Sequence, residues 1–467
     1  MRNRVNRIHF VGIGGSGMSG IAEVMVNLKY SVSGSDIAES PVTQRLLKTG
    51  VNVLIGHDAA YIQDCDVVVV SSAIDPTNPE VEAALEIGIP VIPRAEMLGE
   101  LMRFQTGIAI AGTHGKTTTT SLVAAILITD GLDPTFVVGG LINSAGANAK
   151  LGRGEYLVAE ADESDASFLN LKPEMAIVTN IDEDHMVTYQ GDLETLKKTF
   201  VAFLQNLPFY GLAVLCADDE NVQAIRASVH KPVVTYGESE IADFRVSGLR
   251  QKASKMIFKV TRPNVDKDLE IELALPGKHN AMNATAAIAI ATHLGVSDAA
   301  IQKGLSSFQG IGRRFQIFGD VQVAGKNITM VDDYAHHPVE LMATLEAAKD
   351  CWPERRLMVI FQPHRYSRTF DLFDNFVQVL SQQTNLFVCE VYPAGEEPIS
   401  SANGGALCQA IRMRGTSNPI FVPSVEEIVE TVTPLLEDGD VILTMGAGSI
   451  GKASQNLFES LHSGAQL

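Results

Sequence analysis

The segment from Gly112 to Thr120 has the residue types of a loop that binds nucleotide phosphates. It reads Gly-Thr-His-Gly-Lys-Thr-Thr-Thr-Thr and lies between an apolar run, 107–111, and a helix-like run, 121–127. In such loops backbone N–H groups and a helix N-terminus face the phosphate, a lysine adds charge and a hydroxyl can hold Mg2+. Ile110 replaces the usual first glycine, so the loop is a shortened variant. We predict that a nucleoside triphosphate binds to Gly112, Thr113, His114, Gly115, Lys116, Thr117 and Thr118.

A second glycine-rich loop, Gly12-Ile13-Gly14-Gly15-Ser16-Gly17, follows the apolar run 8–11. It has the G-x-G-x-x-G pattern of dinucleotide-binding folds, and Asp36 ends the next expected strand. Alone, this pattern would indicate NAD, although a turn without a ligand would also explain it. Because the chain has two such loops, we predict that one binds ATP and the other binds a nucleotide-bearing substrate.

Two acidic segments lie at the ends of expected strands. Glu160–Asp165 begins at the last residue of the run 156–160. Asn180–His185 begins at the last residue of the run 175–180. Mg2+ prefers carboxylate oxygens, and ligands of parallel sheets bind at the carboxyl ends of strands. We therefore predict Glu160 as a magnesium ligand, and His185 as a metal ligand or an acid–base group. A solvated acidic turn and a surface histidine are the alternatives.

Three further segments carry charged side chains that a fold alone would not require. Gly310–Phe315 lies at an expected domain boundary, whereas Asp332–Pro338 and Gln362–Arg368 each follow an expected strand. Guanidinium groups at such edges can bind phosphate or carboxylate through two parallel hydrogen bonds, although surface solvation would also explain each segment singly. Gly446–Gly451 repeats the G-x-G-x-x-G pattern, and there we favour an ordinary turn between a strand and a helix.

The composition limits the classes of function. The chain has 467 residues, enough for about three domains of ~100–200 residues each. Its formal net charge of −19 argues against a nucleic-acid partner. Its five cysteines are scattered without C-x-x-C spacing, as in a reduced cytosolic protein with no zinc site. We see no signal peptide and no apolar run of ~18 residues, so we expect a cytoplasmic protein that binds no membrane.

Short apolar strands alternate with helices along the chain, which predicts an α/β fold with parallel sheets. Boundaries near 105 and 315 divide it into domains 1–105, 106–315 and 316–467. Residues 240–275 instead alternate polar and apolar side chains, which suits an antiparallel flap, and an alanine-rich helix is expected from Ala281 to about His293. The main expected strands are 8–11, 31–34, 52–55, 67–71, 91–92, 156–160, 175–180, 213–215, 328–331, 357–361, 386–391 and 441–444.

The order of these segments resembles that of the Mur ligase family, the ATP-dependent enzymes that form amide bonds in peptidoglycan synthesis. The resemblance covers essentially the whole chain, and the ordered set is specific although no single segment is decisive. It implies three domains: a UDP-binding Rossmann-like domain, a central P-loop ATPase-type domain and a C-terminal Rossmann-like domain that helps to bind an amino acid. The segments that carry it are His9–Met18, Gly112–Thr120, Glu160–Asp165, Asn180–His185, Gly277–Asn283, Gly312–Phe315, Asp332–Pro338 and Gln362–Arg368.

The resemblance also implies roles for single residues. Lys116 would contact the β- and γ-phosphates, and Mg2+ would be held by Thr117, Glu160 and His185. The rest of the ATP site would comprise His279, Asn280 and Asn283 near the adenine, with Arg313 and Asp333. The amino acid and the reacting carboxylate would face His336, Arg365 and Arg368. The expected catalytic residues are Lys116, His185, Arg365 and Arg368. The uridine nucleotide would bind to Gly12, Gly14, Gly15, Ser16, Gly17, Met18, Asp36, His57, Ser71 and Ser72.

The implied reaction uses ATP to phosphorylate the lactyl carboxylate of UDP-N-acetylmuramate, after which the amine of L-alanine displaces phosphate. Within the family, the alternative is a recycling ligase that adds a preformed tripeptide to the same sugar nucleotide. Outside it, Gly12–Gly17 and Asp36 would suit a nicotinamide-dependent oxidoreductase, but that function leaves Gly112–Thr120 unexplained. The sequence does not distinguish a monomer from a homodimer.

Overall fold

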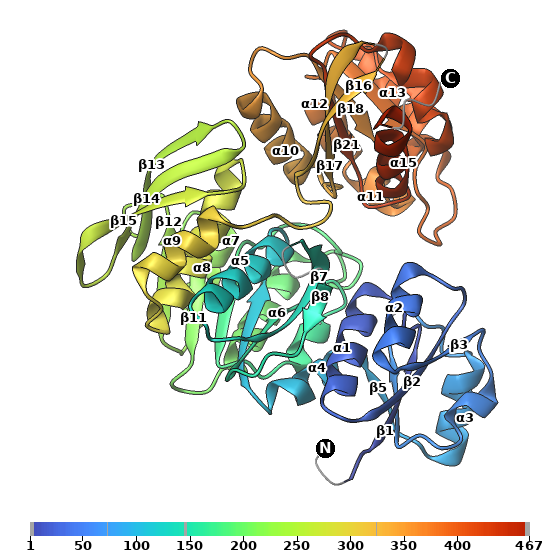
Figure 1. The fold of residues 1–467 in the computed structure, drawn as a ribbon, viewed down its shortest axis with the longest axis vertical. Helices are drawn as coiled ribbons and strands as arrows, with labels where there is room; N and C mark the ends of the chain where they lie inside the picture. The colour runs from blue at the N-terminus through green and yellow to red at the C-terminus, as the bar shows by residue number, and fades with distance from the viewer. Residues whose placement is uncertain (1–3, 72, 144–146, 324, 463–467) are drawn as a thin grey trace. The chain divides into compact units, whose positions relative to one another are not determined.

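The computed structural model describes residues 4–71, 73–143, 147–323 and 325–462, which form three β-sheets with accompanying helices (Figure 1). The chain packs into two compact units. The first comprises Met1–Leu249, Ile257–Leu273 and Asn280–Gln309, and the second comprises Arg250–Met256, Ala274–His279 and Gly310–Leu467. Among the described residues, no helix is both long enough and apolar enough to span a membrane.

The first sheet has five parallel strands in the order β3-β2-β1-β4-β5. Ligands of open α/β sheets bind where the strand order reverses, at the carboxyl ends of the strands. Here the order reverses at β1, and the glycine-rich loop follows that strand. The strands are β1 (Arg7–Val11), β2 (Ser31–Asp36), β3 (Asn52–Ile55), β4 (Val67–Val70) and β5 (Val91–Pro93); the helices are α1 (Ser16–Asn27), α2 (Pro41–Thr49), α3 (Pro79–Ile87) and α4 (Arg94–Met102).

The second sheet has ten strands in the order β15-β14-β13-β12-β11-β10-β6-β9-β7-β8. Its central strand β6 (Thr106–Ala111) pairs in parallel with β10 (Met175–Val178) and with β9 (Tyr156–Glu160). The segments that follow these three strands therefore emerge at one edge of the sheet. The other strands are β7 (Thr135–Ile142), β8 (Ala147–Lys150), β11 (Leu212–Cys216), β12 (Val233–Gly237), β13 (Phe244–Lys252), β14 (Lys255–Arg262) and β15 (Val265–Leu273); the helices are α5 (Lys116–Thr129), α6 (Leu193–Gln205), α7 (Glu220–Arg226), α8 (Lys278–His293) and α9 (Asp298–Ser306).

The predicted flap corresponds to β13, β14 and β15. Only two residues connect each of these strands to the next, and neighbouring strands joined so tightly must run antiparallel. Buried side chains alternate with more exposed ones along these strands, as Phe244 and Val246 do in β13. The expected flap is therefore present.

One hydrophobic core joins the first two sheets. The buried cluster includes Met18 and Met25 of α1, Met97 of α4, Ala149 of β8 and Phe168 of the short 3-10 helix Ser167–Asn170. Close approach of α1 to β8 depends on Gly20, because a Cβ at that position would lie 2.8 Å from the Cβ of Ala149. The two glycine-rich loops of the first unit are thus supported by the same packing.

The third sheet lies in the second unit and has the order β16-β17-β21-β18-β19-β20. It is parallel except for β16, which pairs antiparallel with β17. Side chains alternate between its two faces, so that Met358 and Ile360 enter one buried cluster, and Val359 and Phe361 another. The strands are β16 (Gln316–Val323), β17 (Lys326–Asp333), β18 (Leu357–Phe361), β19 (Asn385–Cys389), β20 (Ile420–Val422) and β21 (Val441–Met445); the helices are α10 (Pro338–Cys351), α11 (Tyr366–Asp371), α12 (Phe373–Leu380), α13 (Gly404–Met413), α14 (Ile428–Val432) and α15 (Ile450–His462).

The predicted α/β fold is confirmed, and each expected strand lies on an observed one. The strands β12, β16 and β20 and the β7–β8 hairpin were not predicted from the sequence. The Gly446–Gly451 segment is the expected turn, and the side chain of Gln362 occupies it: the backbone N–H of Ile450 donates to Gln362 Oε1 over 2.9 Å. A protein side chain therefore binds at the position where a phosphate would sit in a dinucleotide fold.

Candidate active site

Residues Gly112–Gly115 connect β6 to α5 and are called the phosphate loop below. Two glycines permit the backbone conformation of this loop. Gly112 has φ +131°, and a Cβ there would lie 2.0 Å from Thr179 Oγ1. Gly115, the N-cap of α5, has φ +82°, and a Cβ there would lie 2.6 Å from Asn283 Oδ1. Because α5 begins at Lys116, its first backbone N–H groups point toward the loop, as anion binding requires.

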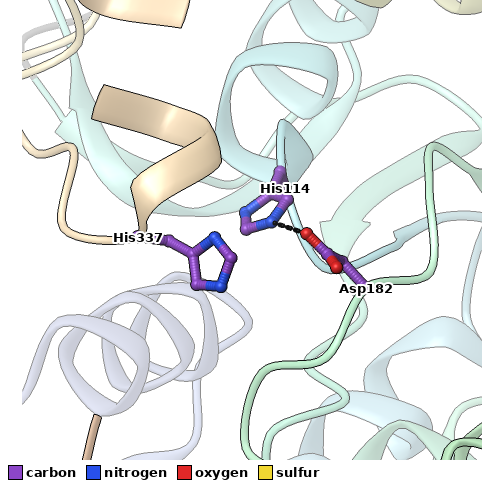
Figure 2. Close-up of side chains that lie close together, drawn as sticks. All are labelled: His114, Asp182 and His337. Carbon is purple, nitrogen blue, oxygen red and sulfur yellow. Dashed lines mark hydrogen bonds and ion pairs between the residues drawn. The ribbon is translucent and has the colours of Figure 1, made fainter. Parts of the chain in front are cut away.

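The segment after β10 holds the loop in place. The N–H of His114 donates to Asn180 Oδ1 over 2.8 Å, and Thr179 Oγ1 donates to the carbonyl of His114 over 2.6 Å. The N–H of Asp182 donates to Thr113 Oγ1 over 2.9 Å. Figure 2 shows the imidazole of His114 directed at the carboxylate of Asp182, with Nε2 and Oδ2 3.1 Å apart. The segment after β10 therefore holds the loop through backbone and side-chain hydrogen bonds.

The ammonium group of Lys116 lies inside the mouth of this loop. It donates to the carbonyls of Gly112 (2.7 Å) and Thr113 (3.1 Å) and forms an ion pair with Glu163, at 2.7 Å to Oε2 and 3.0 Å to Oε1. Burial by itself lowers the pKa of Lys116, but the carboxylates of Glu163, Asp162 and Glu160 outweigh it and raise the pKa. Lys116 is thus held as a cation where phosphates are predicted to bind.

The predicted metal ligands lie on segments at the same sheet edge. Glu160 is the last residue of β9, and its Oε1 accepts from the N–H of Gly139 over 2.8 Å. His185 follows β10 with φ +55°, and its Nε2 lies 3.5 Å from Asp184 Oδ2. Thr117 is buried in the first turn of α5. A hydroxyl and a carboxylate are ligands that suit Mg2+, whereas imidazole is a less usual ligand for it.

The expected adenine-side residues of the first unit lie at the start of α8. Asn280 and Asn283 are buried, and Asn283 Nδ2 donates to Asn280 Oδ1 over 3.3 Å. Asn283 also lies against Gly115, so the structure brings it to the phosphate loop. His279 is an exposed residue in the same turn of the helix and belongs to the second unit.

A pocket of about 270 Å³ extends from the N-terminal glycine loop to Glu160. It is lined by Gly15, Gly17 and Met18 from the loop and α1, by Ser71 after β4, and by Glu160 and Asp162 after β9. A ligand in this pocket would contact both the glycine-rich loop and the acidic segment of the phosphate-loop domain. Ser16 begins α1, and the predicted contact Ser72 lies outside the described residues.

Arg94 also lines this pocket, although the sequence analysis did not select it. Its Nη2 lies 3.5 Å from Asp162 Oδ2, and a Cβ on Gly17 would lie 2.2 Å from its Nη1. The guanidinium thus occupies the space left by Gly17 and supplies positive charge between the two domains of the first unit. Its position directly after β5 was a usable signal, because it follows the same strand-end rule as Glu160.

Asp36 and His57 are both engaged by the protein. Asp36 Oδ2 accepts from the N–H of Gly14 over 2.7 Å, so it shapes the glycine loop. His57 Nδ1 lies 3.0 Å from Oε1 of the buried Glu80, which also contacts His9 Nε2 at 2.9 Å and Ser35 Oγ at 2.7 Å. Burial alone would raise the pKa of Glu80, but the hydrogen bonds from His9, Ser35 and His57 outweigh it and lower the pKa. His57 is therefore fixed by a buried carboxylate network.

In the second unit, aromatic and cationic side chains gather at the carboxyl ends of β17, β18 and β19. The His336 ring lies edge-on to Tyr334 and to His364, with centroids 5.4 Å and 6.0 Å apart. His364 stacks on Tyr392 at 5.4 Å. His336 Nδ1–H donates to the carbonyl of Tyr334 over 2.9 Å, which makes Nε2 the basic nitrogen of the neutral ring. Of these four, the sequence analysis selected only His336.

The predicted arginines of this unit differ in exposure. Arg368 is buried and lies 3.4 Å from His364 Nδ1, whereas Arg365 is exposed and has φ +70°. Arg313 donates from Nε to Asp332 Oδ2 over 2.9 Å, and its guanidinium lies 5.0 Å from the ring centroid of Tyr334. Arg313 and Arg368 therefore contact the cluster of Tyr334, His336, His364 and Tyr392.

Asp333 is the last residue of β17 and is buried. Its carboxylate oxygens accept from the N–H groups of Phe315 and Ala335, each over 2.7 Å. Burial raises the pKa of Asp333 to about 6, against the opposing effects of Arg314 and these hydrogen bonds. The carboxylate connects the segment before β16 to the end of β17 and so helps to shape the cluster.

The family models match this chain in three consecutive segments. The Mur ligase family catalytic domain matches residues 7–106, the Mur ligase middle domain matches 110–291, and the Mur ligase glutamate ligase domain matches 313–448. A crystal structure of UDP-N-acetylmuramate-alanine ligase from Thermotoga maritima is 31% identical, covers 98% of this chain and 99% of its own, and superposes with a TM-score of 0.83.

The chain belongs to the Mur ligase family. Two peptide-adding relatives are also similar to it. The murein peptide ligase of Psychrobacter arcticus is 27% identical over 99% of both chains, with a TM-score of 0.72. The UDP-N-acetylmuramate:L-alanyl-gamma-D-glutamyl-meso-diaminopimelate ligase of Neisseria meningitides is 30% identical over 66% of this chain and all of its own, with a TM-score of 0.60. The predicted family and its three-domain architecture are thus confirmed.

The buried Glu80 network predicts a stability effect. Glu80→Gln replaces a charged acceptor by an amide that cannot accept from all of its donors, so the free energy of unfolding should fall by about 2–4 kcal/mol. Because folding lowers the pKa of Glu80, its contribution should be present above the ordinary glutamate pKa and be lost as the pH falls through the lower, folded value.

Thermal unfolding at neutral and acidic pH would measure this effect, with the exposed neighbour Glu82→Gln as the control. The difference from the wild type should be large at neutral pH and shrink in acid. A Glu80→Gln midpoint no lower than that of the control would contradict the assigned role of the network.

Proposed function

We propose that this Mur ligase joins L-alanine to the lactyl carboxylate of UDP-N-acetylmuramate, using ATP and Mg2+. The choice of substrates rests on similarity to the Thermotoga maritima alanine ligase over 98% of the chain. The geometry that supports the reaction is the pocket that runs from Gly15 and Gly17 to Glu160. A diphosphate bound at the glycine loop would direct the sugar of the same molecule toward the phosphate loop.

The proposed domain roles follow from this arrangement. Domain 1–105 would bind the uridine nucleotide, 106–315 would bind ATP, and 316–467 would contribute to binding of the amino acid. In the first unit, the phosphates would contact the N–H groups of the loop and Lys116. Thr117 and Glu160, with His185, would hold Mg2+, which would neutralise charge on the phosphates.

The chemistry begins with activation of a carboxylate, a poor acylating group. One carboxylate oxygen attacks the γ-phosphorus of ATP. The bond from that phosphorus to the bridging oxygen breaks, so that ADP leaves and an acyl phosphate forms. The amine of L-alanine then attacks the acyl carbon, and inorganic phosphate departs with the former carboxylate oxygen. Phosphoryl transfer depends mainly on positioning and on neutralised charge, which Lys116 can provide.

The amine must be neutral to attack, so a base has to accept a proton. His185 and His336 are the proposed candidates, and Nε2 of His336 would be the accepting atom of the neutral ring. Arg365 and Arg368 would bind the carboxylates through their guanidinium groups. The stacked rings of His364 and Tyr392 would add a wall beside the amino acid.

A second candidate is the ligase that adds a preformed tripeptide to the same sugar nucleotide. Similarity to the Psychrobacter arcticus murein peptide ligase over 99% of the chain favours it. The two ligases share an acceptor and differ in the amine donor. The nicotinamide-dependent oxidoreductase gains no support, because the matching family models describe ligases. A cytoplasmic location, and a monomer or a homodimer, stay predictions.

The direct test of this function is phosphate release from ATP in the presence of UDP-N-acetylmuramate and different amine donors. L-Alanine should support rapid release that depends on both the sugar nucleotide and Mg2+, whereas glycine, L-serine and the tripeptide should support less. Release with the tripeptide but not with L-alanine would assign the second function. Stabilisation by NADH, with no stabilisation by the uridine nucleotide, would contradict both ligase functions.

Arg94 provides a prediction for the substrate pocket. Arg94→Ala should raise the KM for UDP-N-acetylmuramate by about tenfold or more, because one charge-assisted contact is worth roughly 1.5–3 kcal/mol. The KM for ATP should change little. Arg103→Ala, which removes an exposed arginine just after α4, is the matched control. Equal KM values for the sugar nucleotide in the two variants would show that Arg94 does not bind the substrate.

A further inference from the structure

The ion pair between Lys116 and Glu163 involves the atom that the phosphates are predicted to need. The ammonium group has three N–H donors. The carbonyls of Gly112 and Thr113 and the two oxygens of Glu163 all lie within 3.1 Å of Nζ. The donor capacity of Lys116 is therefore used by the protein. A phosphate oxygen that binds Nζ must displace at least one of these acceptors.

Glu163 supplies a carboxylate to this set of acceptors, whereas Gly112 and Thr113 supply neutral carbonyls. Glu163 is 2% exposed, so water contributes little to the solvation of its carboxylate. Its backbone carbonyl accepts from the hydroxyl of Tyr189, and Thr188 Oγ1 donates to the next carbonyl, that of Ser164, over 2.7 Å. These bonds tie the segment of Glu163 to the segment that follows His185. The carboxylate is therefore held firmly beside the loop.

Displacement of Lys116 from Glu163 by a nucleotide has two electrostatic costs. The carboxylate would lose its paired cation while buried, and breaking such a pair is strongly destabilising. It would also lie close to the negative phosphates, with Glu160 and Asp162 nearby on the same segment. A cation that arrives with the nucleotide can offset both costs, because it places positive charge among these carboxylates.

We propose that Glu163 is a positioning residue that holds Lys116 in the empty loop and makes nucleotide binding depend on a divalent cation. This inference rests on the proposed ATP-binding function of the loop. Without the metal, the nucleotide competes with a buried carboxylate for the lysine. With the metal, that carboxylate is neutralised and Lys116 can bind the phosphates. Glu163 thereby disfavours occupancy of the loop by a nucleotide that cannot react.

The test compares the affinity of the whole chain for ATP in excess EDTA with its affinity in Mg2+, using isothermal titration calorimetry. Glu163→Gln removes the charge and nearly preserves the shape. The variant should bind metal-free ATP about fivefold to tenfold more tightly than the wild type. The ratio of the dissociation constant in EDTA to that in Mg2+ should therefore be smaller for the variant. Glu155→Gln is the control, because Glu155 is an exposed glutamate directly before β9. It should leave both dissociation constants unchanged.

The possible results separate this inference from the proposed function. If the wild type binds ATP and Glu163→Gln has an unchanged or larger ratio, the positioning role is wrong while the function stands. If neither protein binds ATP with or without Mg2+, the proposed function itself is wrong. A purely structural role for Glu163 would weaken binding in both conditions alike, which would also contradict the inference.

A second measurement does not require ATP or a stable Glu163→Gln variant. Lys116→Met should lower the midpoint of thermal unfolding, because it leaves Glu163 buried without its paired cation. The double variant Lys116→Met/Glu163→Gln should recover most of that loss, since the unpaired charge is removed. A double variant no more stable than Lys116→Met would show that the two side chains are not coupled.

Discussion

The parallel pairing of β6 with β9 and β10 is the constraint on which the candidate site depends. It brings the phosphate loop, the Glu160 segment and the Asn180–His185 segment to one sheet edge. Because the chain has a formal net charge of −19, we expect phosphates to bind to local groups and not to an extended basic surface. Backbone N–H groups at the start of α5 and the ammonium of Lys116 are suited to this task.

The same edge concentrates negative charge that has to be balanced. Glu160, Asp162 and Glu163 all lie near Lys116, and Asp162 also lies 3.5 Å from Arg94. Burial raises the pKa of Glu163 to about 7, although Lys116 opposes this shift. Such a site favours ligands that bring cations with them. We therefore infer that the acidic segment Glu160–Asp165 favours binding of a nucleotide with its metal ion, and does not act only as a set of metal ligands.

Much of the candidate site could be predicted because two sequence rules depend only on neighbouring residues. Polar residues that follow an apolar strand lie at the sheet edge, and a glycine-rich loop before a helix can bind phosphate. Lys116 and Glu160 follow apolar strands, and the structure places both at the expected edge. Arg94 could have been selected by the same rule, because it directly follows β5. Glu163 could not, because its proposed role depends on a tertiary contact with Lys116 that spacing does not reveal. The strand β16 was missed for a related reason: its pairing with β17 is interrupted by a register shift between Ile317 and Gly319, which disturbs the alternation.

The N-terminal loop shows that a motif does not by itself specify a ligand. Its G-x-G-x-x-G pattern with Asp36 is that of a dinucleotide fold, but Asp36 Oδ2 accepts from the N–H of Gly14 and so supports the loop itself. His57 likewise contacts Glu80 through Nδ1. The pattern indicates that the backbone of the loop can bind a diphosphate. The nucleoside that follows depends on side chains that the pattern does not specify.

Formation of an acyl phosphate is the central claim, and oxygen transfer tests it most directly. UDP-N-acetylmuramate labelled with 18O in its lactyl carboxylate would be converted with ATP, Mg2+ and L-alanine, and the released phosphate analysed by mass spectrometry. The proposed mechanism predicts one 18O atom in each phosphate, because the carboxylate oxygen leaves with the phosphoryl group. Amide product accompanied by unlabelled phosphate would contradict activation of the carboxylate by phosphorylation.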